Sequence, residues 1–102
     1  MTLKPTVSLT SLPRNRAVSV VVEGREIVLC RTDDGVCALD GICTHQDLSL
    51  DGGEVVEDVL TCPWHGARYD VRTGRVLSLP AIRSLKTYKT TVAEDGVVHI
   101  ET

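Results

Sequence analysis

Two short stretches of the chain each pair one cysteine with one histidine, and they limit the possible folds more than any other feature. The stretches are Cys43-Thr44-His45 and Cys62-Pro63-Trp64-His65-Gly66, with sixteen residues between them. A structural zinc finger usually takes two cysteines from one knuckle and two histidines from another, because each knuckle closes on a single metal ion. One cysteine and one histidine per loop instead fit a site with two metal centres, in which the thiolates bind one iron and the imidazoles bind the other. The fold must therefore bring both loops together.

With Tyr69-Asp70 and Thr73-Gly74 further along the chain, these two stretches resemble the motifs of the Rieske ferredoxins. The resemblance covers roughly a third of the sequence. It implies one Rieske-type [2Fe-2S] cluster with four ligands: Cys43, His45, Cys62 and His65. The alternatives are a mononuclear zinc site and an empty site with a degenerate motif.

Five further residues are expected to lie around the cluster: Gln46, Trp64, Gly66, Tyr69 and Pro80. Gln46 and Trp64 flank the ligands, where they either shield the cluster, dock a partner or simply pack. Pro80 belongs to the stretch 78–81, which resembles the proline-containing loop that covers the cluster in this family. Pro80 could also simply end a strand.

Charge counting explains why two imidazoles matter for the reduction potential. Two ferric ions, two sulfides and two thiolates sum to zero charge, so this cluster accepts an electron more easily than a four-thiolate cluster does, and Rieske potentials fall at about −150 to +300 mV. High-potential members of the family carry an extra, mutually bonded cysteine in each loop and a serine that donates to a sulfide. The resemblance places Leu48, Trp64 and Ala67 at these positions, while Tyr69 could donate to a thiolate sulfur. We therefore expect a potential at the low end of the range.

The remaining sequence predicts an all-β chain. No window has apolar residues at helical spacing with caps, whereas Val18, Val20 and Val22 alternate as in a half-buried strand, and turn signals such as Glu23-Gly24 recur between β-branched runs. The predicted strands are 16–22, 25–31, 36–39, 54–60, 68–71, 75–77, 85–93 and 97–100. We expect one domain, 1–102, with the Rieske-like antiparallel β-sandwich or barrel fold and an inserted cluster-binding subdomain at approximately 42–77.

Composition limits the partners and the compartment. Fourteen acidic and eleven basic residues give a net charge of −3 without a Lys/Arg block, which argues against nucleic acid as a partner. The first fifteen residues lack the apolar run of a signal peptide, and no stretch approaches the ~18 apolar residues that span a membrane. We expect a cytoplasmic protein without membrane contact, in which four reduced cysteines indicate metal or redox chemistry before disulfides.

The remaining cysteines and histidine lie outside the two loops. Cys30 and Cys37 flank the turn 33–35 almost symmetrically, so they could face each other across a hairpin and bond if oxidised, although buried thiols are the stronger expectation. His99 has no cysteine near it in the sequence, and a structural role is expected for it.

A length of 102 residues leaves no room here for a catalytic iron domain or a flavin domain, so we expect an electron-transfer component and not an enzyme. By resemblance, this is the monomeric ferredoxin of a multicomponent dioxygenase system for aromatic hydrocarbon catabolism. It would take electrons from an NAD(P)H-dependent flavin reductase and pass them to a terminal ring-hydroxylating oxygenase. The alternatives are the small Rieske subunit of an assimilatory nitrite reductase and a zinc-stabilised interaction module.

Overall fold

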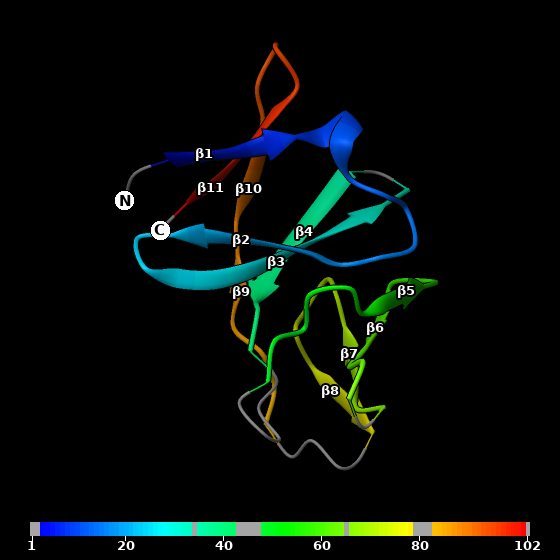
Figure 1. Ribbon diagram of the computed structural model, residues 1–102. Coiled ribbons are helices and arrows are strands. Elements are labelled where there is room, and N and C mark those ends of the chain that lie inside the picture. Colours follow the sequence, from blue (N-terminus) through cyan, green and yellow to red (C-terminus); the bar gives the residue numbers. More distant parts are fainter. Residues whose placement is uncertain (1–2, 34, 43–47, 65, 79–82, 102) are drawn as a thin grey trace.

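The computed structural model describes residues 3–33, 35–42, 48–64, 66–78 and 83–101, and the regular secondary structure of these residues is almost entirely β-strand (Figure 1). These residues form eleven strands in three antiparallel sheets, with one short 3-10 turn, η1 (Leu9–Ser11). The architecture confirms the predicted all-β antiparallel fold.

Each sheet is built mainly from hairpins of neighbouring strands. The first sheet has the order β1 (Leu3–Ser8), β11 (Val97–Glu101), β10 (Thr90–Val92). The second has the order β2 (Val18–Val22), β3 (Arg25–Thr32), β4 (Gly35–Asp40), β9 (Thr87–Tyr88). The third has the order β5 (Glu54–Val56), β6 (Val59–Thr61), β7 (Arg68–Asp70), β8 (Val76–Ser78). Figure 1 shows the second sheet between the other two.

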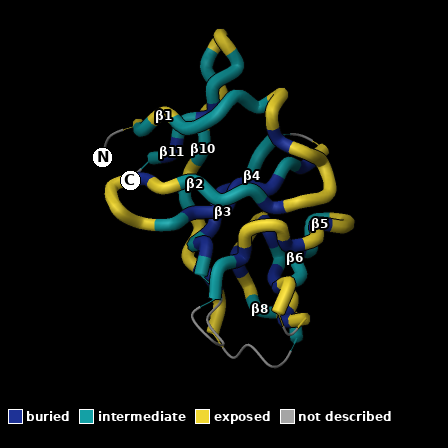
Figure 2. The backbone as a smooth tube through the Cα atoms, in the orientation of Figure 1, coloured by how far each residue is buried: buried dark blue, intermediate teal, exposed yellow. Residues whose placement is uncertain are grey.

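Strand β3 is covered on both faces because it lies between two hydrophobic clusters. Ile27 and Leu29 point into the cluster that also contains Val98 and Ile100 of β11. The alternate side chains of β3, Val28 and Cys30, belong to the other cluster, shared with Leu60 of β6 and Tyr69 of β7. Figure 2 shows buried backbone running through this middle layer. The third sheet is thereby anchored to the second through the cluster that contains Val28 and Cys30.

The sequence analysis missed strand β1. This strand pairs with β11, so that Leu3 lies opposite Glu101 at the other end of the chain. It contains Pro5, which lacks a backbone N–H and is accommodated in β-sheets mainly at an edge such as this one.

Two predicted strands are each divided in the structure. The range 54–60 is wrong as a single strand, since Glu57 and Asp58 have φ values of 50° and 64° and form the turn between β5 and β6. Without a glycine in this turn, the local turn signal was absent. The range 85–93 is wrong as well, because the chain changes sheets at Lys89: β9 pairs with β4, and β10 pairs with β11. The other predicted strands end within two residues of the observed ones.

Among the described residues, strands β5 to β8, within residues 54–78, pair with one another, and β5 has in addition an isolated bridge between Glu54 and Arg16. Whether the segment 42–77 is a separate subdomain stays a prediction, because residues 43–47 and 65 are not among those described. No helix in the described ranges is long and apolar enough to cross a membrane.

Candidate metal centre

The second cysteine-histidine stretch forms a closed loop between β6 and β7. The backbone N–H of Cys62 donates to the carbonyl of Ala67 at 2.7 Å, and the N–H of Gly66 donates to the carbonyl of Cys62 at 3.2 Å. Gly66 has a φ of 75°, a left-handed conformation that glycine adopts without steric cost. Backbone hydrogen bonds therefore join the described residues Cys62, Gly66 and Ala67 of this loop, whereas the predicted ligand His65 lies outside the described residues.

The residues on either side of the first stretch pair with each other and form a neck at the base of this loop, made of Gly41, Ile42, Ser49 and Leu50. The N–H of Leu50 donates to the carbonyl of Gly41 at 2.7 Å, and Ile42 and Ser49 form an isolated antiparallel bridge. The segment between these residues is thus held at both ends. The predicted ligands Cys43 and His45, together with Gln46, lie outside the described residues.

A side-chain hydrogen bond joins the second loop to the base of the first. The indole N–H of Trp64 donates to the backbone carbonyl of Ser49 at 3.1 Å. The second loop therefore lies beside the neck of the first, as a shared metal site requires. Sequence reasoning missed the role of Ser49, because the acceptor is a main-chain oxygen and any residue type could supply it.

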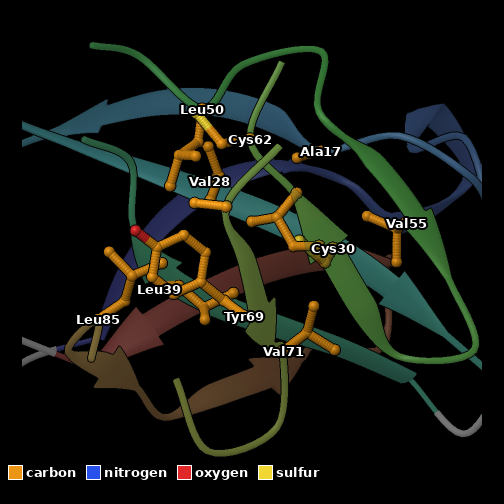
Figure 3. Close-up of a cluster of buried hydrophobic side chains, with 12 residues drawn as sticks. Ala17, Val28, Cys30, Leu39, Leu50, Val55, Cys62, Tyr69, Val71 and Leu85 are labelled. Atoms are coloured by element: carbon orange, nitrogen blue, oxygen red, sulfur yellow. The ribbon is translucent and has the colours of Figure 1, made fainter. Parts of the chain in front are cut away.

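Cys62 is the predicted ligand whose surroundings the structure describes. Its side chain is only 3% exposed and lies in the cluster with Leu50, Leu60 and Tyr69 (Figure 3). A buried thiol in a backbone-fixed loop fits a soft thiolate ligand to iron, because the core keeps water away from the metal-sulfur bond. Within the described ranges, no three His, Cys, Asp or Glu residues gather into a group, as expected when three of the four predicted ligands lie outside them.

The residues predicted around the cluster differ in exposure. Tyr69 and Ala67 are fully buried, whereas the Trp64 side chain is 58% exposed although its N–H is bonded. Pro80 lies outside the described residues, but the chain is held on either side of it, since the N–H of Val76 donates to Ser84 Oγ at 3.1 Å. The described residues that flank the gaps at 43–47, 65 and 79–82 all lie at the same end of the molecule (Figure 1).

The other candidate side chains lie away from this end. Cys30 and Cys37 are direct partners across β3 and β4, and both are thiols. Cys30 is buried as expected, whereas Cys37 is only half-buried. His99 Nδ1 lies 3.2 Å from the carbonyl of Val97 on β11, which is consistent with the structural role expected for this residue.

Comparisons with known proteins agree with this geometry. Residues 3–89 match the family described as the Rieske [2Fe-2S] domain. The ferredoxin component of the naphthalene 1,2-dioxygenase system of Pseudomonas aeruginosa is 35% identical over 82 residues, which make up 80% of this chain and 79% of that protein. The ferredoxin of carbazole 1,9a-dioxygenase from Nocardioides aromaticivorans IC177 superimposes with a TM-score of 0.90 at 28% identity, over 98% of this chain and 97% of that one.

Two other solved structures concern the partners of such proteins. In a complex of reduced oxygenase and oxidized ferredoxin in carbazole 1,9a-dioxygenase, one chain aligns with a TM-score of 0.87 at 27% identity, over 96% of this chain and 91% of that one. A protein described as an NADH-dependent nitrite reductase small subunit from Mycobacterium tuberculosis aligns with a TM-score of 0.85 at 21% identity, over 97% and 93% of the two chains. The second likeness shows the shared fold alone.

Proposed function

Because the chain belongs to the Rieske [2Fe-2S] domain family, we propose that it is the ferredoxin of a multicomponent oxygenase system. It accepts one electron at a time from an NAD(P)H-dependent flavin reductase and delivers it to a terminal oxygenase that hydroxylates aromatic rings. Its cofactor is one Rieske-type [2Fe-2S] cluster, which supplies the one-electron chemistry. The relatives named as ferredoxin components of dioxygenase systems support this role.

In this proposal Cys43 and Cys62 bind one iron, and His45 and His65 bind the other. The hydrogen bond from Trp64 to Ser49 carries the assignment, because it holds the second loop against the neck of the first. Cys62 presents its thiolate from the core, and backbone hydrogen bonds hold Cys62 and the described residues at the base of the first loop.

The partners are inferred from the relatives. The oxygenase complex with a ferredoxin of the same fold supports a terminal oxygenase as electron acceptor. The role of nitrite reductase subunit is less well supported, since that likeness is one of fold at 21% identity. We further propose that the protein acts in the cytoplasm as a monomer.

One spectrum of the purified protein tests the cofactor, and one assay tests the role. A brown protein with a rhombic EPR signal that appears only after dithionite reduction is expected, whereas a colourless zinc protein would overturn the proposal. In a reconstituted assay with a flavin reductase and a ring-hydroxylating oxygenase, product should form only when this chain is added. Copurification with a siroheme-containing subunit would instead favour the nitrite reductase role.

The reduction potential should rise when a hydroxyl is introduced at Ala67. This residue is fully buried beside Gly66, at the position where high-potential relatives carry a serine donor. A donor stabilises the reduced, more negative cluster, so Ala67→Ser should have a higher potential than the wild type in a redox titration. Ala17→Ser is the matched control, because Ala17 is equally buried in the same cluster but lies outside both loops. A wild-type potential near +300 mV would contradict the expected low-potential environment.

Trp64 is proposed to contact the partner proteins, since its ring is largely exposed beside a ligand loop. Trp64→Ala should raise the KM of the oxygenase for this ferredoxin about tenfold or more, because exposed tryptophans often contribute strongly to interfaces. Trp64→Phe, which keeps an aromatic ring but loses the N–H bonded to Ser49, separates docking from loop support. Val21→Ala truncates another exposed apolar side chain, on β2, and should leave the KM unchanged.

A further inference from the structure

The second sheet contains a pair of thiols that the electron-carrier role does not use. Cys30 of β3 and Cys37 of β4 lie directly opposite each other in the antiparallel register. Directly opposed residues have Cβ atoms about 4.5–5.5 Å apart on the same face, and a disulfide needs about 3.5–4.5 Å. A closing movement of about 1 Å therefore suffices to join the two sulfurs.

The two thiols differ in access to solvent. Cys30 is fully buried, and Figure 3 shows its side chain among the core residues near Val55 and Val71. Cys37 is half-buried and lines a groove of about 450 Å³ between β4, the segment following β7, and the chain from β9 to β10. The groove thus gives a reagent access to Cys37, whereas Cys30 has no exposed surface.

Positive side chains line the same groove. Arg72 and Lys89 belong to its wall, and the Arg72 charge is partly balanced by Asp58, with 2.8 Å between Arg72 Nε and Asp58 Oδ2. Because of Lys89, the groove has a net positive charge, which favours the binding of small reagents that carry carboxylates.

We propose that Cys37 is a thiol-modification site for anionic low-molecular-weight disulfides, such as oxidised glutathione, and that Cys30 resolves the adduct. The Cys37 thiolate attacks one sulfur of the reagent, so that a mixed disulfide forms and one reagent thiolate leaves. Cys30 then loses its proton to that thiolate and attacks Cys37 Sγ, which releases the second half of the reagent as a thiolate, and this thiolate takes up the proton that Cys37 lost before the first step. The two cysteines lose two electrons in total, and one reagent disulfide is reduced to two thiols.

Burial fixes the order of the two steps. It raises the pKa of the Cys30 thiol to about 12, with a smaller contribution from the neighbouring Cys37. Cys30 is therefore almost wholly protonated near neutral pH, and because only the thiolate is an effective nucleophile, it cannot attack first. The second step is correspondingly slower, so the mixed disulfide should be detectable before the internal disulfide.

The test uses the cluster-loaded protein with an excess of oxidised glutathione, followed by intact-mass spectrometry over time. The wild type should first gain one glutathione and then lose it, ending lighter than the starting protein by two hydrogen atoms. Cys30→Ala should keep the adduct at about one per chain, and Cys37→Ala should gain at least tenfold less. Dithiothreitol should restore every starting mass, and the visible spectrum of the cluster should persist throughout.

Three results would overturn the inference. The first is a wild-type protein that keeps both thiols unmodified under conditions in which the reagent oxidises a small model thiol. The second is a Cys37→Ala variant that is modified as fast as the wild type, which would place the reactive thiol elsewhere. The third is a Cys30→Ala adduct that peptide mapping assigns to a cysteine other than Cys37.

Discussion

Replacing Cys62 by alanine is expected to abolish cluster binding. Cys62 is the proposed thiolate ligand in the closed loop after β6, and its side chain is buried in the hydrophobic core. Removing residues that only support a metal ligand already costs 10–100-fold in affinity, so losing a ligand should cost at least about as much. Iron and acid-labile sulfide per chain should fall more than about tenfold, and the rhombic EPR signal should disappear.

Cys30→Ala is the matched control for this experiment. Cys30 is also a buried thiol in the same hydrophobic cluster, but it lies on β3 and outside both ligand loops. Its replacement removes a similar volume from the core and should leave the iron content and the EPR signal intact. If Cys62→Ala keeps its iron, or if both variants lose it equally, the ligand assignment is wrong and the loss reflects core packing.

Much of the fold could be predicted because its strands carry local signals. The alternation of Val18, Val20 and Val22 and the turn at Glu23-Gly24 predicted the hairpin of β2 and β3, which the structure confirms. Strand β1 was missed, since its partner β11 lies at the far end of the chain and no local pattern reports such a pairing. The break at Lys89 was missed for the same reason: the change of sheet depends on which strands are neighbours in space.

For the candidate site too, local sequence motifs could be interpreted, whereas features that depend on spatial neighbours could not be predicted. The residue types and spacing of the two loops indicated the cofactor, because iron ligands are chemically restricted to a few side chains. For Trp64, the sequence left packing, shielding and docking open. Its 58% exposure and its bond to the carbonyl of Ser49 depend on how the two loops meet, which no residue pattern encodes. Exposure near a ligand loop favours docking among the three alternatives.

Gly74→Ala should destabilise the fold strongly. Gly74 lies between β7 and β8 of the third sheet and contacts Leu85, in the segment that leads to β9 of the second sheet. The N–H of Leu85 donates to the carbonyl of Gly74 at 2.7 Å, and a Cβ on Gly74 would lie 2.0 Å from the carbonyl oxygen of Leu85. The clash is with backbone, so it can be relieved only by moving Leu85, which is buried in the cluster with Cys62. Gly74 also has a φ of 76°, which costs a residue with a side chain about 1–2 kcal/mol by itself.

Gly24→Ala separates the two contributions to this cost. Gly24 has the same φ of 76°, but nothing lies within 4 Å of a Cβ built there. Gly24→Ala should therefore lower the free energy of unfolding by about 1–2 kcal/mol, and Gly74→Ala by about 3 kcal/mol or more. Denaturant unfolding followed by circular dichroism measures both, with the cluster absorbance as a second readout. Leu85 and Cys62 belong to the same hydrophobic cluster. Gly74→Ala should therefore also weaken the binding of the [2Fe-2S] cluster, whereas Gly24→Ala should not. Equal losses in the two variants would show that backbone conformation alone, and not the contact with Leu85, makes glycine necessary at position 74.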